Sequence, residues 1–451
     1  MKERSSFSSK LGFVMAAAGS AIGLGNIWRF PYLAAKYGGG SFLLIYVVLA
    51  CTFGFTLMMA EVALGRKTRQ SAIGAYKKLS GKFAFEGIIT AAVPIIIFPY
   101  YTIINGWVLK YFFAYMIGDD KKAAGANYFG SFISETWEPL IWFIICLIII
   151  VIVILAGVEK GIEAISKTLM PILLVLMVLI SIYVCTRSGA SAGIKYYLVP
   201  NFKELSVKTV LAAMGQLFYS LSLAMGIMIT YGSYMKKEDN MENSVRQIEF
   251  FDTLVAVLAG LMVIPSVFAF SGGGKEALTA GPSLMFITLP KAFMGMGAGR
   301  WVGAGFFLMV FFAALTSSIS LMEAVASILM DAFKISRRRA AVIIVSYSMV
   351  LGGLASLGYG PLKNVKIIGM QLLDFMDFIS NSVLMPVVAI VTCIFVGFVI
   401  KPKAIIEEVE QDGVVFRGKK MFTVVIKYIA PWVMLAVLIS SIAQAAGWLK
   451  L

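Results

Sequence analysis

The stretch that decides the fold reads Gly19-Ser20-Ala21-Ile22-Gly23-Leu24-Gly25-Asn26-Ile27-Trp28-Arg29-Phe30-Pro31. It lies in the middle of an apolar run that otherwise has the composition of a membrane-spanning helix. Its glycines and its proline weaken that helix. In lipid, each backbone N–H or C=O freed by a break costs several kcal/mol unless it is bound. The break therefore predicts a polar cavity at mid-membrane depth, where an ion or a charged solute binds the freed backbone groups.

Apolar segments of spanning length recur along the whole chain. Of its 451 residues 60% are hydrophobic and 14% are charged, and the mean hydropathy is +0.88. Since a span takes about 20 apolar residues, we expect about eleven of them. The expected spans are 9–36, 41–65, 86–117, 139–157, 160–186, 209–235, 243–270, 301–333, 338–358, 364–400 and 421–448. The fold class is thus an all-α polytopic membrane protein, with residues 1–451 forming a single domain.

Basic residues gather before the first span and in every second loop after it, including 66–82, 334–339 and 401–420. This alternation is the positive-inside pattern, which predicts a multi-pass protein of the plasma (cell inner) membrane with a cytoplasmic N-terminus. The net charge of +15 then reflects contact with the lipid bilayer, and we expect no nucleic-acid partner.

The chain has no histidine. This excludes Ser-His-Asp triads, Cys-His dyads and most zinc sites, and we expect a protein that is not an enzyme. The four cysteines are scattered through apolar segments, as small core residues are.

A second interrupted helix lies in the sixth span, between Gly215 and Gly226. Matching breaks in the first and sixth spans are typical of an inverted repeat of five plus five helices, with the binding site between the halves. The predicted repeats are 9–186 and 209–400, and 421–451 forms a peripheral eleventh helix.

The segments 19–31, 215–226 and Leu315-Thr316-Ser317-Ser318 together resemble the neurotransmitter:sodium symporter family, in its bacterial amino-acid branch. The resemblance extends over nearly the whole chain. It implies a transporter domain that imports an amino acid together with two sodium ions by alternating access.

The resemblance also implies the ligands of both ions. The first sodium site consists of Ala21, Asn26, Ser220 and Asp252, together with the carboxylate of the substrate. The second consists of the Gly19, Ile22 and Ala313 carbonyls and the Thr316 and Ser317 hydroxyls. Sodium prefers such hard oxygen ligands.

Asp252 is an ionisable residue inside the seventh span, and such a residue is a candidate functional group by default. Many relatives bind chloride nearby, using a tyrosine, a glutamine and serines. Tyr46, Gln216 and Ser220 match that pattern, but Ala256 replaces the last serine. We expect the Asp252 carboxylate to supply the negative charge and transport to be independent of chloride.

Gly23 stands where monoamine carriers have an aspartate, so the resemblance implies an α-amino acid as substrate. Its carboxylate is expected to meet the Leu24 and Gly25 N–H groups, which lie at the positive end of a half-helix, and the Tyr101 hydroxyl. Its amine is expected to meet Ala21, Tyr219, Ser220 and Ser222. The side-chain pocket is expected to be formed by Ser20, Ile97, Tyr101, Tyr219, Ser222, Met225, Ser317 and Leu321. This pocket is apolar and uncharged, which favours neutral, hydrophobic or aromatic L-amino acids.

The resemblance also implies an outer and an inner gate. Arg29 and Asp377 are expected to close the outer side, and Arg4 with Asp331 the inner side. The alternatives are an ion channel, which would carry a polar stripe along several helices, and a non-transporting amino-acid sensor. The sequence indicates no oligomeric state.

Overall fold

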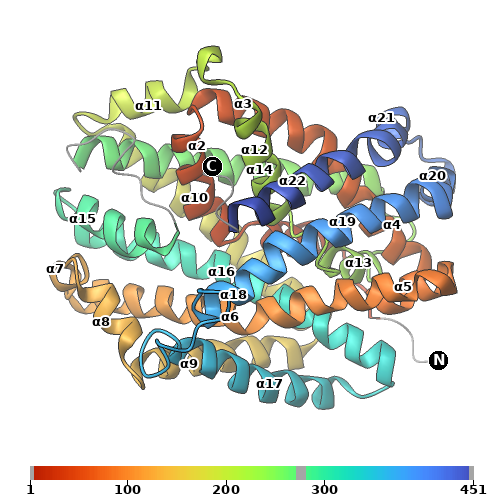
Figure 1. The fold of residues 1–451 in the computed structure, drawn as a ribbon, viewed down its shortest axis with the longest axis horizontal. Coiled ribbons are helices and arrows are strands. Elements are labelled where there is room, and N and C mark those ends of the chain that lie inside the picture. The colour runs from red at the N-terminus through yellow and green to blue at the C-terminus, as the bar shows by residue number, and fades with distance from the viewer. Residues whose placement is uncertain (1–4, 271–280, 446–451) are drawn as a thin grey trace.

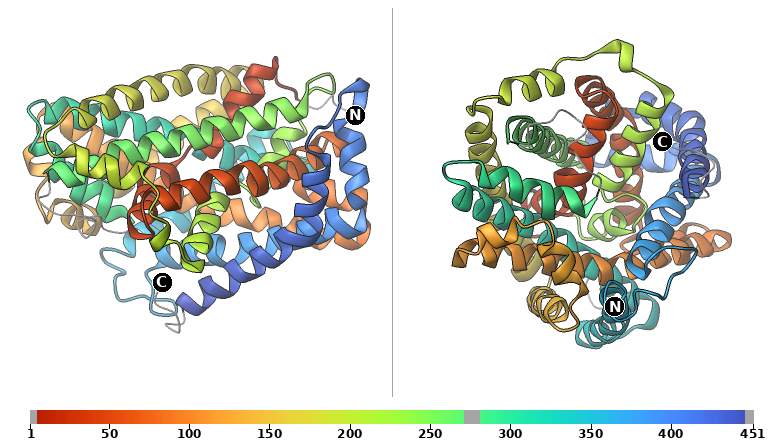
Figure 2. Two further views of the ribbon diagram at one scale, coloured as in Figure 1. Left: turned by 90° about the horizontal axis from the view of Figure 1, so that it is seen from above. Right: turned by 60° about the vertical axis from the view of Figure 1, so that its left-hand side comes forward.

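The apolar runs form helices that lie side by side along a common direction (Figure 1, Figure 2). This computed structural model describes residues 5–270 and 281–445. Within those ranges the only extended pairings are two isolated bridges, Gly39 with Pro200 and Ile367 with Met370. The all-α class expected from the sequence is confirmed.

In the part of the chain that the structure describes, nine helical segments are long and apolar enough to cross a membrane. They are Gly40–Thr68 (α3 and α4), Gly81–Ile117 (mainly α6, Ala84–Ile117), Glu138–Ala156 (α9), Val158–Cys185 (mainly α10, Ala164–Cys185), Met241–Phe270 (α14), Gly299–Phe333 (α16), Arg337–Leu357 (α17), Leu372–Val399 (α18 and α19) and Lys419–Ala445 (α21 and α22). Each lies within a few residues of an expected span, except that the tenth begins at Leu372 instead of 364, because turns occupy the intervening residues.

Two further stretches that were expected as spans are broken. The first counts as a tenth span of the described residues, and the second is not among the candidate spans, so nine or ten are found where about eleven were expected. The first consists of α1 (Lys10–Ala21) and the segment Gly25–Lys36, which includes α2 (Phe30–Lys36), and it bends by 53°. The sixth consists of α12 (Val207–Ser220) and α13 (Ile227–Gly232), with residues 221–226 outside both helices. Both breaks lie where the glycine-rich stretches predicted them.

Shorter helices connect the spans at both ends of the bundle. They are α5 (Ala72–Leu79), α7 (Asp120–Ala123), α8 (Tyr128–Ser134), α11 (Ala190–Leu198), α15 (Leu289–Met294) and α20 (Lys401–Val409). The connection before the eighth span contains a π-helical segment, Leu284–Thr288, that leads into α15, and residues 271–280 lie outside the described residues.

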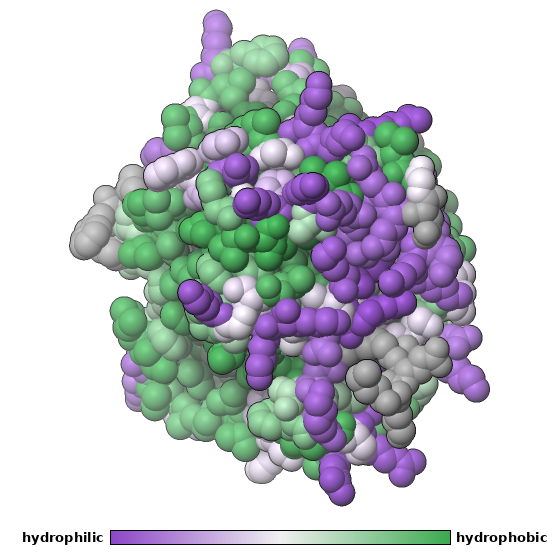
Figure 3. All heavy atoms as spheres, turned by 90° about the vertical axis from the view of Figure 1, so that its right-hand side faces the viewer, coloured by the Kyte–Doolittle hydropathy of each residue, from purple (hydrophilic) through white to green (hydrophobic). Residues whose placement is uncertain are grey.

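The broken spans are enclosed by the others. Helix α1 packs against α14 and α16, α12 packs against α3, and α13 packs against α4. The outer helices α9, α10 and α17 instead expose apolar side chains such as Ile152, Leu179 and Val350. An exposed apolar band of this kind fits a lipid surface. Hydrophilic side chains gather on the end of the bundle where α5 and α20 lie (Figure 3).

Candidate functional site

The break in the first span exposes backbone groups to side chains from distant helices. After Ala21 the chain leaves the α-helix, and Ile22 is extended with ψ 99°. The Leu24 N–H donates to the Tyr101 hydroxyl over 3.1 Å. The Gly25 carbonyl accepts from the Gln216 side chain of α12 over 2.9 Å. The Leu24 N–H therefore binds a side chain, and the Gly25 carbonyl binds one in addition to the Phe30 N–H.

The break in the sixth span has an unusual backbone. Ser222, Ala224 and Gly226 have φ values of 52°, 59° and 69°, in the left-handed region that glycine tolerates best. The Ser222 hydroxyl donates to the Ser20 carbonyl over 2.9 Å. The two breaks thus touch each other in the interior of the bundle.

A cavity lies between the breaks, and α6 and α16 supply its remaining walls. Every residue expected in the side-chain pocket contributes to its lining, and so do Ala21 and Gly25. The full lining is Ser20, Ala21, Gly23, Gly25, Asn26, Ile97, Tyr101, Tyr219, Ser222, Met225, Ile227, Ser317 and Leu321. Leu24 and Ser220 lie beside the cavity and are buried. Sequence reasoning missed Ile227, although it is the residue at which the helix resumes after Gly226.

The oxygens expected around the second sodium ion lie close together. The Ser317 hydroxyl is 3.4 Å from the Gly19 carbonyl oxygen, 3.3 Å from that of Ile22 and 3.1 Å from that of Ala313. The Thr316 hydroxyl is 3.1 Å from the same Ala313 oxygen. One hydroxyl proton cannot satisfy several carbonyls at once. This group of carbonyl and hydroxyl oxygens fits a sodium ion as ligands.

Asp252 is fully buried and joins the first break to the sixth span. Its Oδ1 accepts from Asn26 and from Ser220, each over 2.8 Å. Its Oδ2 accepts from the Tyr46 hydroxyl over 3.1 Å. Ala21, whose carbonyl was expected to complete the first sodium site, lines the adjoining cavity. The expected residues of this site are therefore neighbours in the fold.

The two charges that were expected to close the outer side lie near Tyr219, a residue of the cavity lining. The Arg29 guanidinium stacks over the Tyr219 ring, 5.2 Å from its centroid. Asp377 accepts from Tyr100 over 3.1 Å and from Asn381 over 2.6 Å, and it interacts electrostatically with Arg29. Arg29 and Asp377 thus lie near the Tyr219 ring, which forms part of the cavity wall.

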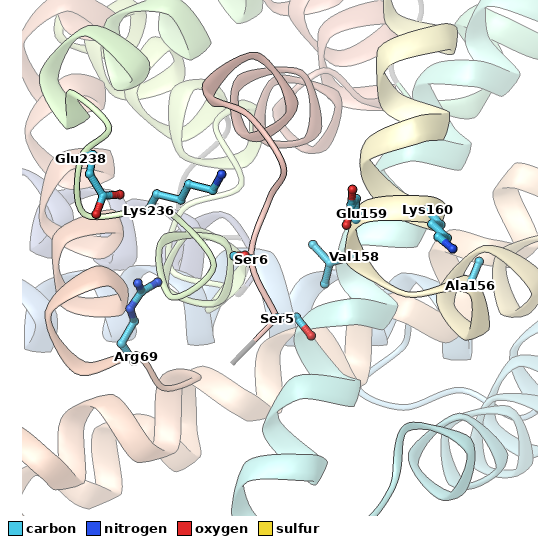
Figure 4. A pocket seen from close by; sticks show the side chains of 9 residues that line it. All are labelled: Ser5, Ser6, Arg69, Ala156, Val158, Glu159, Lys160, Lys236 and Glu238. Atoms are coloured by element: carbon cyan, nitrogen blue, oxygen red, sulfur yellow. The ribbon is translucent and has the colours of Figure 1, made fainter. Parts of the chain in front are cut away.

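Of the pair that was expected to close the inner side, Asp331 accepts from the Ser71 N–H over 2.8 Å, while Arg4 lies outside the described residues. The hollow in Figure 4 separates the start of the chain from the fifth span. It is lined by Ser5, Ser6, Arg69, Ala156, Val158, Glu159, Lys160, Lys236 and Glu238. The Lys236 ammonium donates to the Ser8 carbonyl over 2.9 Å, which fastens the chain's start to the loop before α14.

Comparison with known proteins assigns the chain to a family. The profile described as "Sodium:neurotransmitter symporter family" matches residues 4–121 and 129–448. The chain belongs to this family. The resemblance noted in the sequence is confirmed, and the protein is a multi-pass membrane transporter of a sodium-dependent symporter family.

Individual relatives agree with this assignment. A sodium-dependent transporter of Bacillus subtilis, YhdH, is 34% identical over 444 residues, which cover 97% of each chain. The human sodium- and chloride-dependent GABA transporter 2 is 27% identical, over 91% of this chain and 75% of its own length. The crystal structure of MhsT in complex with L-phenylalanine superposes with a TM-score of 0.87 at 35% identity, covering 97% of this chain and 100% of the other.

Proposed function

We propose that this protein imports neutral, hydrophobic or aromatic L-amino acids, coupled to two sodium ions, by alternating access across the plasma membrane. The observation that carries the proposal is the cavity between the two helix breaks, where backbone groups and uncharged side chains converge. Membership of the family supports the coupling to sodium, and the bound L-phenylalanine of MhsT supports the substrate class.

The substrate's carboxylate binds at the first break. A methyl group at Gly23 would lie 2.7 Å from the Tyr101 hydroxyl and 2.9 Å from the Ser317 hydroxyl, so only glycine leaves room between them. The carboxylate meets the Leu24 and Gly25 N–H groups there and ligates the first sodium ion. Negative charge is favoured at this point because helix N–H groups point toward it.

The amine binds the oxygens of Ala21, Tyr219, Ser220 and Ser222 on the opposite side. The substrate's side chain then lies against Ile97, Met225 and Leu321, which offer only apolar surface. A charged side chain would be buried there without a partner at high cost, and this excludes basic and acidic amino acids.

Sodium and substrate stabilise each other's binding, because the carboxylate is a ligand of the first ion. Such coupling is reciprocal, so sodium raises the affinity for the amino acid and the amino acid raises that for sodium. Loss of the second ion to a low-sodium cytoplasm opens the inner gate of Arg4 and Asp331, and Arg29 and Asp377 close the outer one. The repeats 9–186 and 209–400 move against each other during this exchange.

Asp252 makes the protein independent of chloride in this proposal. Its buried carboxylate, bound by Asn26, Ser220 and Tyr46, already places a fixed negative charge beside the first sodium site. A second anion at that position would be repelled.

A scintillation proximity assay with labelled L-phenylalanine tests the proposal. We expect binding in sodium gluconate, none in potassium gluconate, and competition by leucine, tryptophan and tyrosine more than by alanine. Tyr101→Phe removes the hydroxyl that faces the carboxylate and should weaken binding about tenfold, or about 1.4 kcal/mol.

Tyr347→Phe is the matched control for that variant, because the Tyr347 hydroxyl is buried without a protein partner. It should bind like the wild type. Equal binding in sodium and potassium, or identical binding by the two tyrosine variants, would contradict the proposal.

A further inference from the structure

Two buried carboxyl groups lie outside the site described above. Glu61 on α4 is 3% exposed and Glu86 on α6 is fully buried. In each of them Oε2 is buried and has no hydrogen-bond partner among residues 5–270 and 281–445. The two carboxyls interact electrostatically with each other, and both act on Tyr76.

The remaining oxygen of each carboxyl has a defined partner. Oε1 of Glu61 accepts from the Ala224 N–H over 2.7 Å, in the break of the sixth span. Oε1 of Glu86 accepts from the Thr392 hydroxyl over 3.3 Å, and that hydroxyl is 2.7 Å from the Tyr76 hydroxyl. The carboxyl pair is therefore attached to the same break that forms the substrate cavity.

No basic side chain balances this pair within the described part of the chain. The titratable groups that face it are Tyr76 from α5 and Cys393 from α19, and neither is a cation. Among the described residues, Glu61 accepts from the Ala224 N–H and Glu86 from the Thr392 hydroxyl, and both donors are neutral. Two adjacent carboxylates in an apolar interior without a counter-ion are very costly when both are ionised.

A third unpartnered oxygen belongs to the same cluster. Thr90, one turn after Glu86 on α6, is 1% exposed, and its hydroxyl has no hydrogen-bond partner in the part of the chain that the structure describes. A Cβ on Gly226 would lie 3.2 Å from the Thr90 methyl group, so this side chain packs against the break of the sixth span. Thr90 thus adds a buried hydroxyl next to the same break of the sixth span to which Glu61 is bound.

We propose that Glu61 and Glu86 form a proton-binding site that holds a proton at neutral pH. The proton forms an O–H bond on one Oε2, which converts that acceptor into a donor and removes one of the two buried negative charges. One proton leaves the pair with a single negative charge, which the Ala224 N–H and the Thr392 hydroxyl stabilise. This site takes a proton, whereas the sites around Asp252 and Ser317 take sodium.

The site is also linked to conformation. When the sixth span rearranges and withdraws the Ala224 N–H, Glu61 loses the donor that favours its ionised form, and the pair then binds its proton more tightly. Proton uptake and release would in this way accompany movement of the break, in addition to the sodium coupling of the proposed function.

Infrared difference spectroscopy on the purified wild type and variants tests the proposal without requiring transport. We expect the wild type at neutral pH to show a carboxylic-acid C=O band that shifts in D2O and that Glu86→Gln removes or displaces. Glu249→Gln, which changes another buried carboxyl that is not part of the pair, should leave this band in place.

Three results would overturn the proposal. The first is a protonated-carboxyl band that is identical in the wild type, Glu61→Gln and Glu86→Gln. The second is a band that disappears when sodium replaces potassium at constant pH, since a sodium ion would then occupy the site. If the glutamine variants do not fold, Thr392→Val serves instead, because it keeps both carboxyl groups and removes the hydroxyl that donates to Glu86. This variant should shift the band. The third contradicting result is a band that Thr392→Val leaves unshifted.

Discussion

At the scale of single residues, the expected second sodium site contains more carbonyl oxygens around the Ser317 hydroxyl than its one proton can bind. Ser317 lies within hydrogen-bond distance of carbonyls from α1, from the first break and from its own helix. A serine in an apolar helix ordinarily donates to the carbonyl four residues earlier and does nothing else. The extra carbonyls, supplied by a different span, distinguish Ser317 from Ser266, whose buried hydroxyl donates only to Met262 over 2.6 Å.

Ser317→Ala should therefore lower the affinity for sodium by about tenfold, a loss of about 1.4 kcal/mol. The reason is that it removes one hard oxygen ligand while the surrounding carbonyls remain. Sodium titration of L-phenylalanine binding measures the effect. Ser266→Ala is the control and should leave the sodium titration unchanged, and equal curves for the two variants would contradict the assignment.

Asp252→Ser tests the fixed charge beside the first sodium site. A serine keeps an oxygen but removes the negative charge, and it leaves room for an anion near Tyr46 and Gln216. We expect uptake by the variant to fall at least tenfold in gluconate, about 1.4 kcal/mol, and to recover in part when chloride is added. The wild type should transport equally in both media, and a wild type that requires chloride would refute the role given to Asp252.

At the scale of helices, the breaks are held open by backbone conformation as well as by side chains. Gly226 adopts a φ of 69°, and an added Cβ would meet Thr90 Cγ2 at 3.2 Å and Ala72 Cβ at 3.3 Å. A Cβ added to Gly215, on α12 of the same span, would meet no atom within 4 Å. Gly226 is therefore needed for the backbone conformation of the break, whereas Gly215 can be replaced by alanine without a steric clash.

Gly226→Ala should destabilise the folded protein by about 1–2 kcal/mol, the cost of a left-handed residue that has a Cβ. Gly215→Ala should be neutral or stabilising by about 0.5–1 kcal/mol, because alanine suits a helix interior better than glycine does. Thermal unfolding of the purified proteins compares them. A Gly226→Ala variant as stable as Gly215→Ala would show that the break does not need this conformation.

Much of this organisation could be predicted from the sequence, because lipid permits few backbone arrangements. Apolar length located the spans, and Gly19–Pro31 located the first break. The contacts between distant helices could not be predicted from the sequence in the same way. Nothing in the local sequence around Glu86 indicates that it interacts with Glu61, because that depends on how α5 packs against both α4 and α6. Ile227 was missed for a related reason, since the lining of the cavity depends on where the helix resumes.

At the scale of the whole molecule, the arrangement separates two surfaces and an interior. Apolar side chains on α9, α10 and α17 are exposed, and the polar residues of the two breaks are buried. Hydrophilic side chains gather on the end of the bundle where α5 and α20 lie (Figure 3). A bundle whose polar groups converge on one enclosed cavity suits a carrier that binds and then releases its substrate. A pore would need polar groups along its full length.

The accumulation of labelled L-phenylalanine in proteoliposomes is the most direct test of the central claim, that the paired breaks bind sodium and an amino acid together. Vesicles with an inward sodium gradient should concentrate the amino acid above the external level and lose it when the gradient is dissipated. Vesicles with an equal potassium gradient should only equilibrate. Equal accumulation under the two gradients would contradict the account.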